Sequence, residues 1–190
     1  MLAAVAIVLD SAILVVGATV VGPEFGPLAG IAVGLVHGRF SIVRQSLITL
    51  VVGFAIAIVV TTVPGLLASW AGWIDPSVLT ADRPLTGFIW RPDRWSFVVA
   101  FIAGIAGILS LTSAKSGALV GVFISVTTVP AAGNLGLALA LGDADELGGA
   151  AVQLGVNMAA IVLAGMLTLL VLKATAGRLS RLSAGRRPAA

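Results

Sequence analysis

Cysteine is absent from this 190-residue chain, and histidine occurs once, as His37. Without cysteine there are no disulfides, thiolate metal sites or cysteine nucleophiles, and a single histidine cannot build a histidine metal cluster. Charged residues are also scarce, at 10% of the chain, whereas hydrophobic residues make up 59%. This composition is too apolar for a soluble domain, so the sequence predicts a polytopic membrane protein.

Apolar runs follow one another along the chain. A short run covers residues 1–9, and longer runs, which approach the roughly 20 residues of a spanning helix, cover residues 12–36, 46–63, 97–111, 118–141 and 148–172. The 23 glycines and few aromatic residues favour closely packed helices over a β-barrel. We therefore predict an all-α membrane protein with five full transmembrane helices and a partial first helix. The transmembrane domain is predicted over residues 1–172 and a basic cytoplasmic tail over 173–190.

Charge in the connections alternates along the chain. Basic connections without acids lie at residues 37–45, 112–117 and 173–190. The connections between them are acidic or balanced and lie at Asp10, 64–96 and 143–146. The positive-inside rule therefore places the basic connections and the C-terminus in the cytoplasm, and the segment with all four tryptophans, 64–96, at the outer interface. The basic tail is expected to contact anionic lipid headgroups.

A weak internal repeat appears when the sequence is slid by about 104 residues against itself. Aligned identities are Gly17 with Gly121, Leu35 with Leu139, Gly38 with Gly142 and Leu50 with Leu154. The run GPEFGP, residues 22–27, then falls opposite VTTVPA, residues 126–131. We predict a 3+3 inverted repeat, over 1–63 and 97–172, with two Pro/Gly-broken helices at these positions. The offset also leaves the first helix incomplete: either the true start lies upstream or a half-helix suffices.

Several motifs in these runs resemble the hydrophobic membrane family known as domain of unknown function 389, over essentially the full length. Matching residues are Gly17, Ala18, Pro23, Gly26, Pro27, Ala103, Gly104, Ala106, Gly107, Gly121, Val122, Ile124, Pro130, Asn157 and Ile161. The chain departs from the family pattern at Thr19, where methionine is usual, and at Ala131, where many members have a second proline. The resemblance implies a six-helix inverted-repeat domain without an assigned activity, and we expect this chain to lack the soluble domain that many members carry first.

Glu24 is the strongest candidate for a functional residue. An isolated carboxylate within a span is costly, so it should be protonated, paired or hydrated. Since no lysine or arginine lies in a predicted span core, a proton or a cation is its natural counterpart. Backbone groups freed around Pro23, Gly26 and Pro27 would help to bind it. The alternative is that this run lies near the outer interface, where Glu24 is simply solvated.

Polar residues of the second repeat are expected to complete the site. They are Thr127, Thr128, Asn134 and Asn157, and Pro130 would shape the break beside them. A structural alternative exists for the threonines, whose hydroxyls can satisfy the carbonyl that a proline frees. Gln153 and Asn157 share a helical face and are interpreted first as hydrogen-bonding links between helices, with cavity lining as the alternative. The acids at 143–146 are predicted to form a solvated outer loop.

These features together predict a transporter-like or channel-like protein of the plasma or inner membrane. Its expected partners are a small solute, a proton or a cation, and copies of itself in a homo-oligomer. The rival interpretation is a non-transporting sensor or scaffold. No motif resembles a nucleotide-binding loop, a serine–histidine–aspartate set or a metal-spaced cluster, so we expect neither an enzyme nor a cofactor nor a nucleic-acid partner.

Overall fold

The computed structural model describes residues 1–19, 24–91, 93–112 and 118–184, without the side chains of 118–127 and 178–184. Regular structure in these ranges is helical throughout, which confirms the predicted all-α class. The helices are α1 (Leu2–Val8), α2 (Ala12–Thr19), α3 (Phe25–Val36), α4 (Phe40–Trp70), α5 (Ser77–Thr80), the short 3₁₀ helix η1 (Gly87–Ile89), α6 (Arg94–Thr112), α7 (Ala118–Leu141) and α8 (Ala144–Ala184).

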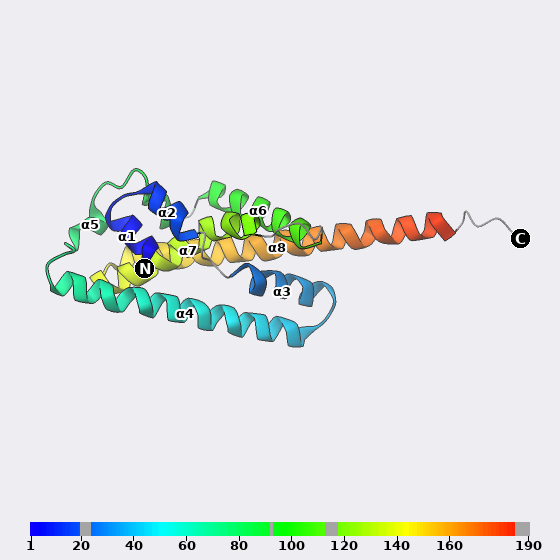
Figure 1. Cartoon of the computed structure of the whole chain (residues 1–190), viewed down its shortest axis with the longest axis horizontal. Coiled ribbons are helices and arrows are strands. Elements are labelled where there is room, and N and C mark those ends of the chain that lie inside the picture. The colour runs from blue at the N-terminus through cyan, green and yellow to red at the C-terminus, as the bar shows by residue number, and fades with distance from the viewer. Residues whose placement is uncertain (20–23, 92, 113–117, 185–190) are drawn as a thin grey trace, which may run out of the picture.

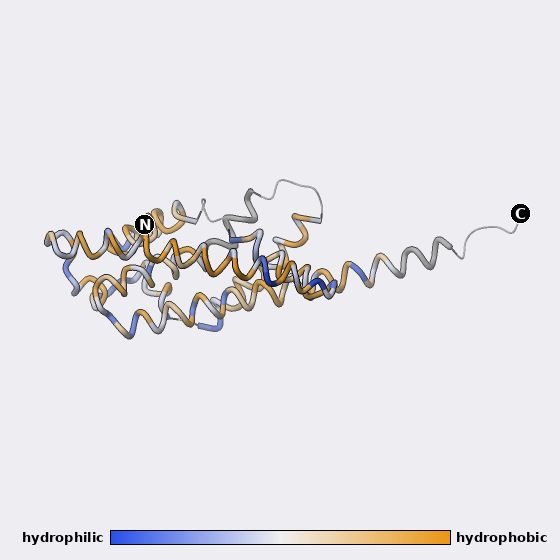
Figure 2. Tube along the Cα trace, turned by 90° about the horizontal axis from the view of Figure 1, so that it is seen from below, coloured by the Kyte–Doolittle hydropathy of each residue, from blue (hydrophilic) through white to orange (hydrophobic). Residues whose placement is uncertain are grey.

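The longer helices run side by side along the long axis of the molecule, and the C-terminal part of α8 extends beyond the others (Figure 1). Helix α7 packs against α1, α2, α4, α6 and α8, while α3 lies against α4 and α8. Hydrophobic residues predominate along these helices (Figure 2). In the described part of the chain, three helical segments are long and apolar enough to cross a membrane: Phe40–Trp70, Arg94–Thr112 and Ala144–Gly177.

The apolar run at 12–36 forms two separate helices. Helix α2 ends at Thr19 and α3 begins at Phe25, so the predicted interruption at 22–27 falls at this junction. Pro23 itself lies outside the described residues. Pro27 is placed in the first turn of α3, where a missing backbone N–H leaves no helical hydrogen bond unmade.

The second predicted break does not occur. Helix α7 continues from Ala118 to Leu141 with Pro130 inside it, so the expectation that Pro130 divides this helix is wrong. A proline in a helix interior costs about 3 kcal/mol through one lost hydrogen bond and a clash with the preceding turn. Because α7 packs against most of the other described helices, its tertiary contacts offset this local cost.

Two turns have the same backbone geometry. Gly38, between α3 and α4, and Gly142, between α7 and α8, both adopt positive φ, at 66° and 76°. In each case the next helix begins two residues later, at Phe40 and Ala144. Glycine reaches this left-handed conformation without the steric cost that a side chain would bring, which is why it ends helices so often.

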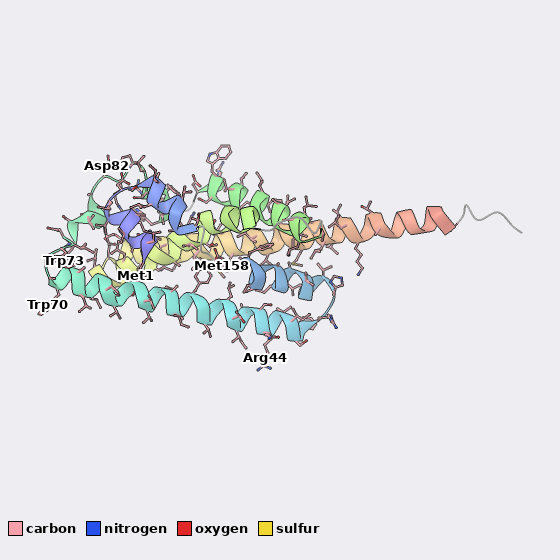
Figure 3. All side chains as sticks on the ribbon, in the orientation of Figure 1. Met1, Arg44, Trp70, Trp73, Asp82 and Met158 are labelled. Carbon is pink, nitrogen blue, oxygen red and sulfur yellow. The ribbon has the colours of Figure 1, made fainter. Side chains whose placement is uncertain are left out.

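The connections gather at two opposite ends of the bundle. We call the end formed by Asp10, 70–95 and 143–146 the tryptophan end; there Asp10 accepts hydrogen bonds from the Leu85 N–H at 3.3 Å and the Thr86 hydroxyl at 2.7 Å. We call the end formed by 37–45 the basic end. Figure 3 shows Trp70, Trp73 and Asp82 at the first end and Arg44 toward the other. Among the described connections, the basic one at 37–45 therefore lies at the opposite end from Asp10 and 143–146.

Candidate functional site

Glu24 and Thr128 meet inside the bundle. Glu24 occupies the N-cap position of α3 and is 6% exposed, and Thr128, in α7, is fully buried. The Thr128 hydroxyl donates a hydrogen bond to Glu24 Oε1 at 2.7 Å, across a sequence separation of 104 residues. This separation is the offset of the predicted repeat, so the two residues in contact are those that the repeat sets opposite each other.

A cavity of about 500 Å³ lies beside this pair. Its walls are mostly aliphatic or aromatic and come from α1, α2, α3, α4 and α7, including Pro27, Leu50, Phe54, Ala57 and Ala132. Among the described residues that line it, Glu24 is the one with an ionisable side chain, Thr49 and Thr61 add hydroxyl groups, and the N-terminal amine of Met1 donates to the Thr61 hydroxyl at 3.1 Å. The cavity is thus an apolar compartment with one acidic group.

Glu24 is buried among mostly apolar neighbours. A buried carboxylate needs a positive partner or several hydrogen bonds to offset its lost hydration. Among the described residues, Glu24 accepts a hydrogen bond from the hydroxyl of Thr128, and the ion pair found in this part of the chain joins Arg83 and Glu146. A proton or a bound cation would remove this imbalance, so the site is chemically suited to hold one.

The other predicted site residues are dispersed around this pair. Asn134 donates from Nδ2 to Glu146 Oε2 at 3.0 Å and does not line the cavity beside Glu24. Pro130 lines a separate cavity of about 300 Å³ together with Gln153. Asn157 is fully buried, and a Cβ at Gly26 would meet open space. Pro23 and the Thr127 side chain lie outside the described residues.

A second buried polar cluster was not predicted. Glu146, expected to be solvated, is 2% exposed and forms an ion pair with Arg83, which is 7% exposed. The expectation of a wholly solvated acidic loop is therefore wrong at Glu146, because the segment carrying Arg83 folds back over the start of α8. Asp143 keeps a capping role and accepts the Glu146 N–H at 2.9 Å. We refer to Arg83, Glu146 and Asn134 as the polar lock.

Arg83 is held from several sides. Besides its ion pair, its Nη2 donates to the Leu79 carbonyl at 3.2 Å. Burial lowers the pKa of the guanidinium, and the carboxylates of Asp10 and Asp143 partly oppose this shift. Arginine starts from so high a value that it stays charged at neutral pH. The contact between Arg83 and Glu146 in the polar lock is therefore ionic.

The signal for this cluster in the sequence was the charge balance of residues 64–96. This segment holds three arginines and three aspartates, a balance compatible with pairing to the bundle as well as with solvation. Whether these charges pair with the bundle or face solvent depends on the path of the segment, and the local spacing of the charges does not specify that path.

Comparison with known proteins adds a family relationship. The model of the family described as "Domain of unknown function (DUF389)" matches residues 19–163. An uncharacterised protein of Methanocaldococcus jannaschii is 26% identical over 157 residues, which cover 83% of this chain and 46% of that relative. The chain thus spans about half the length of the relative that it matches. No solved structure matches the chain significantly.

Proposed function

This chain belongs to the family described as "Domain of unknown function (DUF389)", and from that premise we propose that it is a transporter-like membrane protein in which Glu24 and Thr128 bind a proton or a small cation. The observation that carries the proposal is the buried hydrogen bond between these two residues. A membrane-embedded carboxylate beside a cavity is the usual mark of an ion or proton pathway.

The position of the pair favours a site near the middle of the bilayer. In an inverted repeat, the two halves are related by a two-fold axis that lies in the membrane plane. Residues at equivalent positions touch each other only near such an axis. Glu24 and Thr128 are separated by the repeat offset and are 2.7 Å apart at their oxygens, so under the proposed repeat they lie on the axis, at mid-membrane.

Backbone hydrogen bonds support the same repeat. At the basic end, the Arg39 N–H donates to the Gly34 carbonyl at 2.8 Å, and at the tryptophan end the Asp143 N–H donates to the Ala138 carbonyl at 3.1 Å. Both the donors and the acceptors are separated by the proposed offset. The equivalent turns lie at opposite ends of the bundle, as an inverted arrangement requires.

The chemistry of the cavity favours a proton or a monovalent cation over other ligands. An anion would be repelled by Glu24, and the one basic group at the described wall is the N-terminal amine of Met1, which donates to Thr61. A divalent ion such as Ca²⁺ takes about six to eight oxygen ligands, more than Glu24, Thr49, Thr61 and Thr128 offer. A proton needs only one carboxylate oxygen. We therefore favour proton binding, with a small solute carried in the apolar part of the cavity.

The proposed setting is the plasma or inner membrane, with the basic end and the C-terminus in the cytoplasm. Lysine and arginine cluster in the tail, where they would contact anionic lipid headgroups. This orientation rests on charge alone. A cysteine at Asp82 should then be labelled by an impermeant thiol reagent from outside the cell, and a cysteine at Ser180 should not.

Flux through sealed proteoliposomes tests the proposal. The wild-type protein should pass protons or a small cation, and Glu24→Gln, which mimics the protonated side chain, should insert normally but lose the pH dependence of flux. Asp145→Asn, an exposed carboxylate outside the cavity, is the matched control and should leave flux unchanged. Unaltered pH-dependent flux in Glu24→Gln would remove this residue from the mechanism, and a wild-type protein that passes nothing at any pH would favour a sensor or scaffold.

A further inference from the structure

The segment between the two proposed repeats is held on the bundle by two kinds of buried contact. Leu79 and Ile89 belong to a hydrophobic cluster with residues of α1, α2 and α7, and polar groups add further contacts. Arg83 reaches Glu146 in the first turn of α8, and Thr86 reaches Asp10 between α1 and α2. Arg83, Thr86 and Glu146 are each less than 10% exposed. The segment thus crosses the tryptophan end and touches both halves of the molecule.

A cavity of about 410 Å³ lies at this contact. Unlike the cavity beside Glu24, it is lined mainly by charged and polar groups, among them Asp82, Arg83, Arg91, Asp145 and Glu146. Asp82, Arg91 and Asp145 are exposed at its rim, whereas the Arg83–Glu146 pair is buried at its base. The ion pair therefore separates a polar, exposed compartment from the interior of the bundle.

The same helix carries the polar lock and the proposed site. Asn134, which bonds to Glu146, lies six residues beyond Thr128 in α7, a distance of about 9 Å along the axis. Ala132 and Gly133 lie between Thr128 and Asn134 in α7, and both line the cavity beside Glu24. A movement of α7 that breaks the Asn134–Glu146 bond would therefore also move the wall of that cavity.

The chemistry of the lock suits a contact that opens and closes. A buried ion pair contributes little net stability compared with apolar packing, because both charges must be desolvated. When the pair separates into a polar compartment, however, water hydrates both groups again and offsets the loss. An apolar plug of the same size would gain nothing from water on opening.

We propose that Arg83, Glu146 and Asn134 form a gate at the tryptophan end, closed in this structure, that controls access from that side to the cavity beside Glu24. This inference rests on the proposed function, because a gate requires a pathway. No equivalent lock exists at the described basic end: the positions matching Glu146 and Asn134 at the repeat offset are Ile42 and Gly30, which make no ion pair.

Cysteine accessibility tests the gate, because the chain has no native cysteine. Ala132, which lines the cavity beside Glu24 and is 4% exposed, is replaced by cysteine as the reporter. An impermeant thiol reagent is added to the tryptophan side of sealed membranes, and separately to the basic side. Labelling of this cysteine from the tryptophan side should be slow when Arg83 and Glu146 are intact. Arg83→Gln or Glu146→Gln should raise the labelling rate at least about tenfold. Losing one partner of a buried ion pair shifts the equilibrium between closed and open states by more than that factor.

Three further variants separate a gate from general loosening. The charge swap Arg83→Glu with Glu146→Arg should slow labelling again relative to either single change. Asp145→Asn, a rim carboxylate of the same cavity, is the control and should change nothing. Asn134→Ser removes one hydrogen bond but keeps the ion pair, so it should fold even where the charge variants do not and should raise labelling by a smaller factor.

Several results would overturn the gate. These are unchanged labelling in Arg83→Gln and Asn134→Ser, an equal rise in Asp145→Asn, or an equal rise from both sides of the membrane. The assay reports access and needs no transport. If the lock variants do not change labelling while Glu24→Gln still alters flux, the gate alone is refuted. If the lock variants do change labelling while Glu24→Gln leaves flux unchanged, the proposed site alone is refuted.

Discussion

The turns at Gly38 and Gly142 have the same backbone conformation, but different contacts hold the helices around them. Both glycines have positive φ, and both precede a long helix by two residues. Around Gly142 polar contacts accompany apolar ones: Asp143 caps α8 and Glu146 is buried against Arg83, while the flanking leucines pack against a buried hydrophobic cluster. Around Gly38 the contacts are small residues of α3 packed against α4. The glycines set the fold of each turn, and the neighbouring side chains set how each end can move.

Close packing at the basic end leaves no room for a side chain. A Cβ added to Gly34 would lie 2.7 Å from Val43 Cγ2 and 3.1 Å from the Arg39 carbonyl oxygen, and one added to Gly30 would collide with the Ser46 hydroxyl. Such contacts gain nothing from water when they separate. We therefore expect the tryptophan end to open more readily than the basic end around α3 and α4.

The largest effect on stability is expected from Glu146→Ala. It leaves Arg83 without its ionic partner and Asn134 without its acceptor, both inside the protein. Breaking a buried pair in this way costs about 3–5 kcal/mol. Thermal unfolding in detergent measures this loss of stability. The control is Asp145→Ala, on the exposed face of the same turn, which should stay within about 0.5 kcal/mol of wild type. Equal stability of the two variants would mean that the lock is not closed in solution.

A smaller loss is expected at the other turn from Gly34→Ala. The methyl group must displace Val43 or the adjoining backbone, and overpacking of this kind costs about 1–3 kcal/mol. Gly155→Ala is the matched change, because a Cβ there meets no atom within 4 Å, and it should be neutral or slightly stabilising. If both alanines behave alike in the same unfolding assay, α3 and α4 are not packed as closely as described.

The smallest effect is expected from Asp93→Ala, an exposed cap at the tryptophan end. Asp93 accepts hydrogen bonds from the Ser96 N–H at 2.6 Å and the Ser96 hydroxyl at 2.8 Å, and these bonds lower the pKa of its carboxyl. A lowered pKa stabilises the fold above the unfolded value and loses that contribution as pH falls through the folded value. The melting-temperature difference from wild type should therefore be greatest near neutral pH and shrink in acid; a pH-independent difference would exclude the cap.

Sequence patterns anticipated the helices better than the contacts between distant segments. Apolar run length predicted the all-helical class because burial in lipid requires satisfied backbone groups. The repeat offset set Glu24 opposite Thr128, and the structure places these two residues in contact. The number of full spans, the repeat and the inner location of the basic end remain predictions.

The two wrong expectations have a common physical origin. The expectation for Pro130 considered only the local effect of proline, and the packing of α7 against most of the other described helices overrides that effect. Glu146 was assigned to solvent from its acidic neighbours, but its partner Arg83 lies 63 positions away in a segment whose path is set by tertiary contacts. Neither outcome can be read from residues close in sequence, because both depend on long-range packing.

Infrared difference spectroscopy in lipid tests the central claim most directly, since it observes the carboxyl group of Glu24 and its hydrogen bond from Thr128. A pH step on the wild-type protein should change a carboxyl C=O band that is lost in Glu24→Gln. The band should shift in Thr128→Val, which removes the donor, and persist unshifted in the exposed control Asp82→Asn. Identical difference spectra for wild type and Glu24→Gln would contradict proton binding at this site.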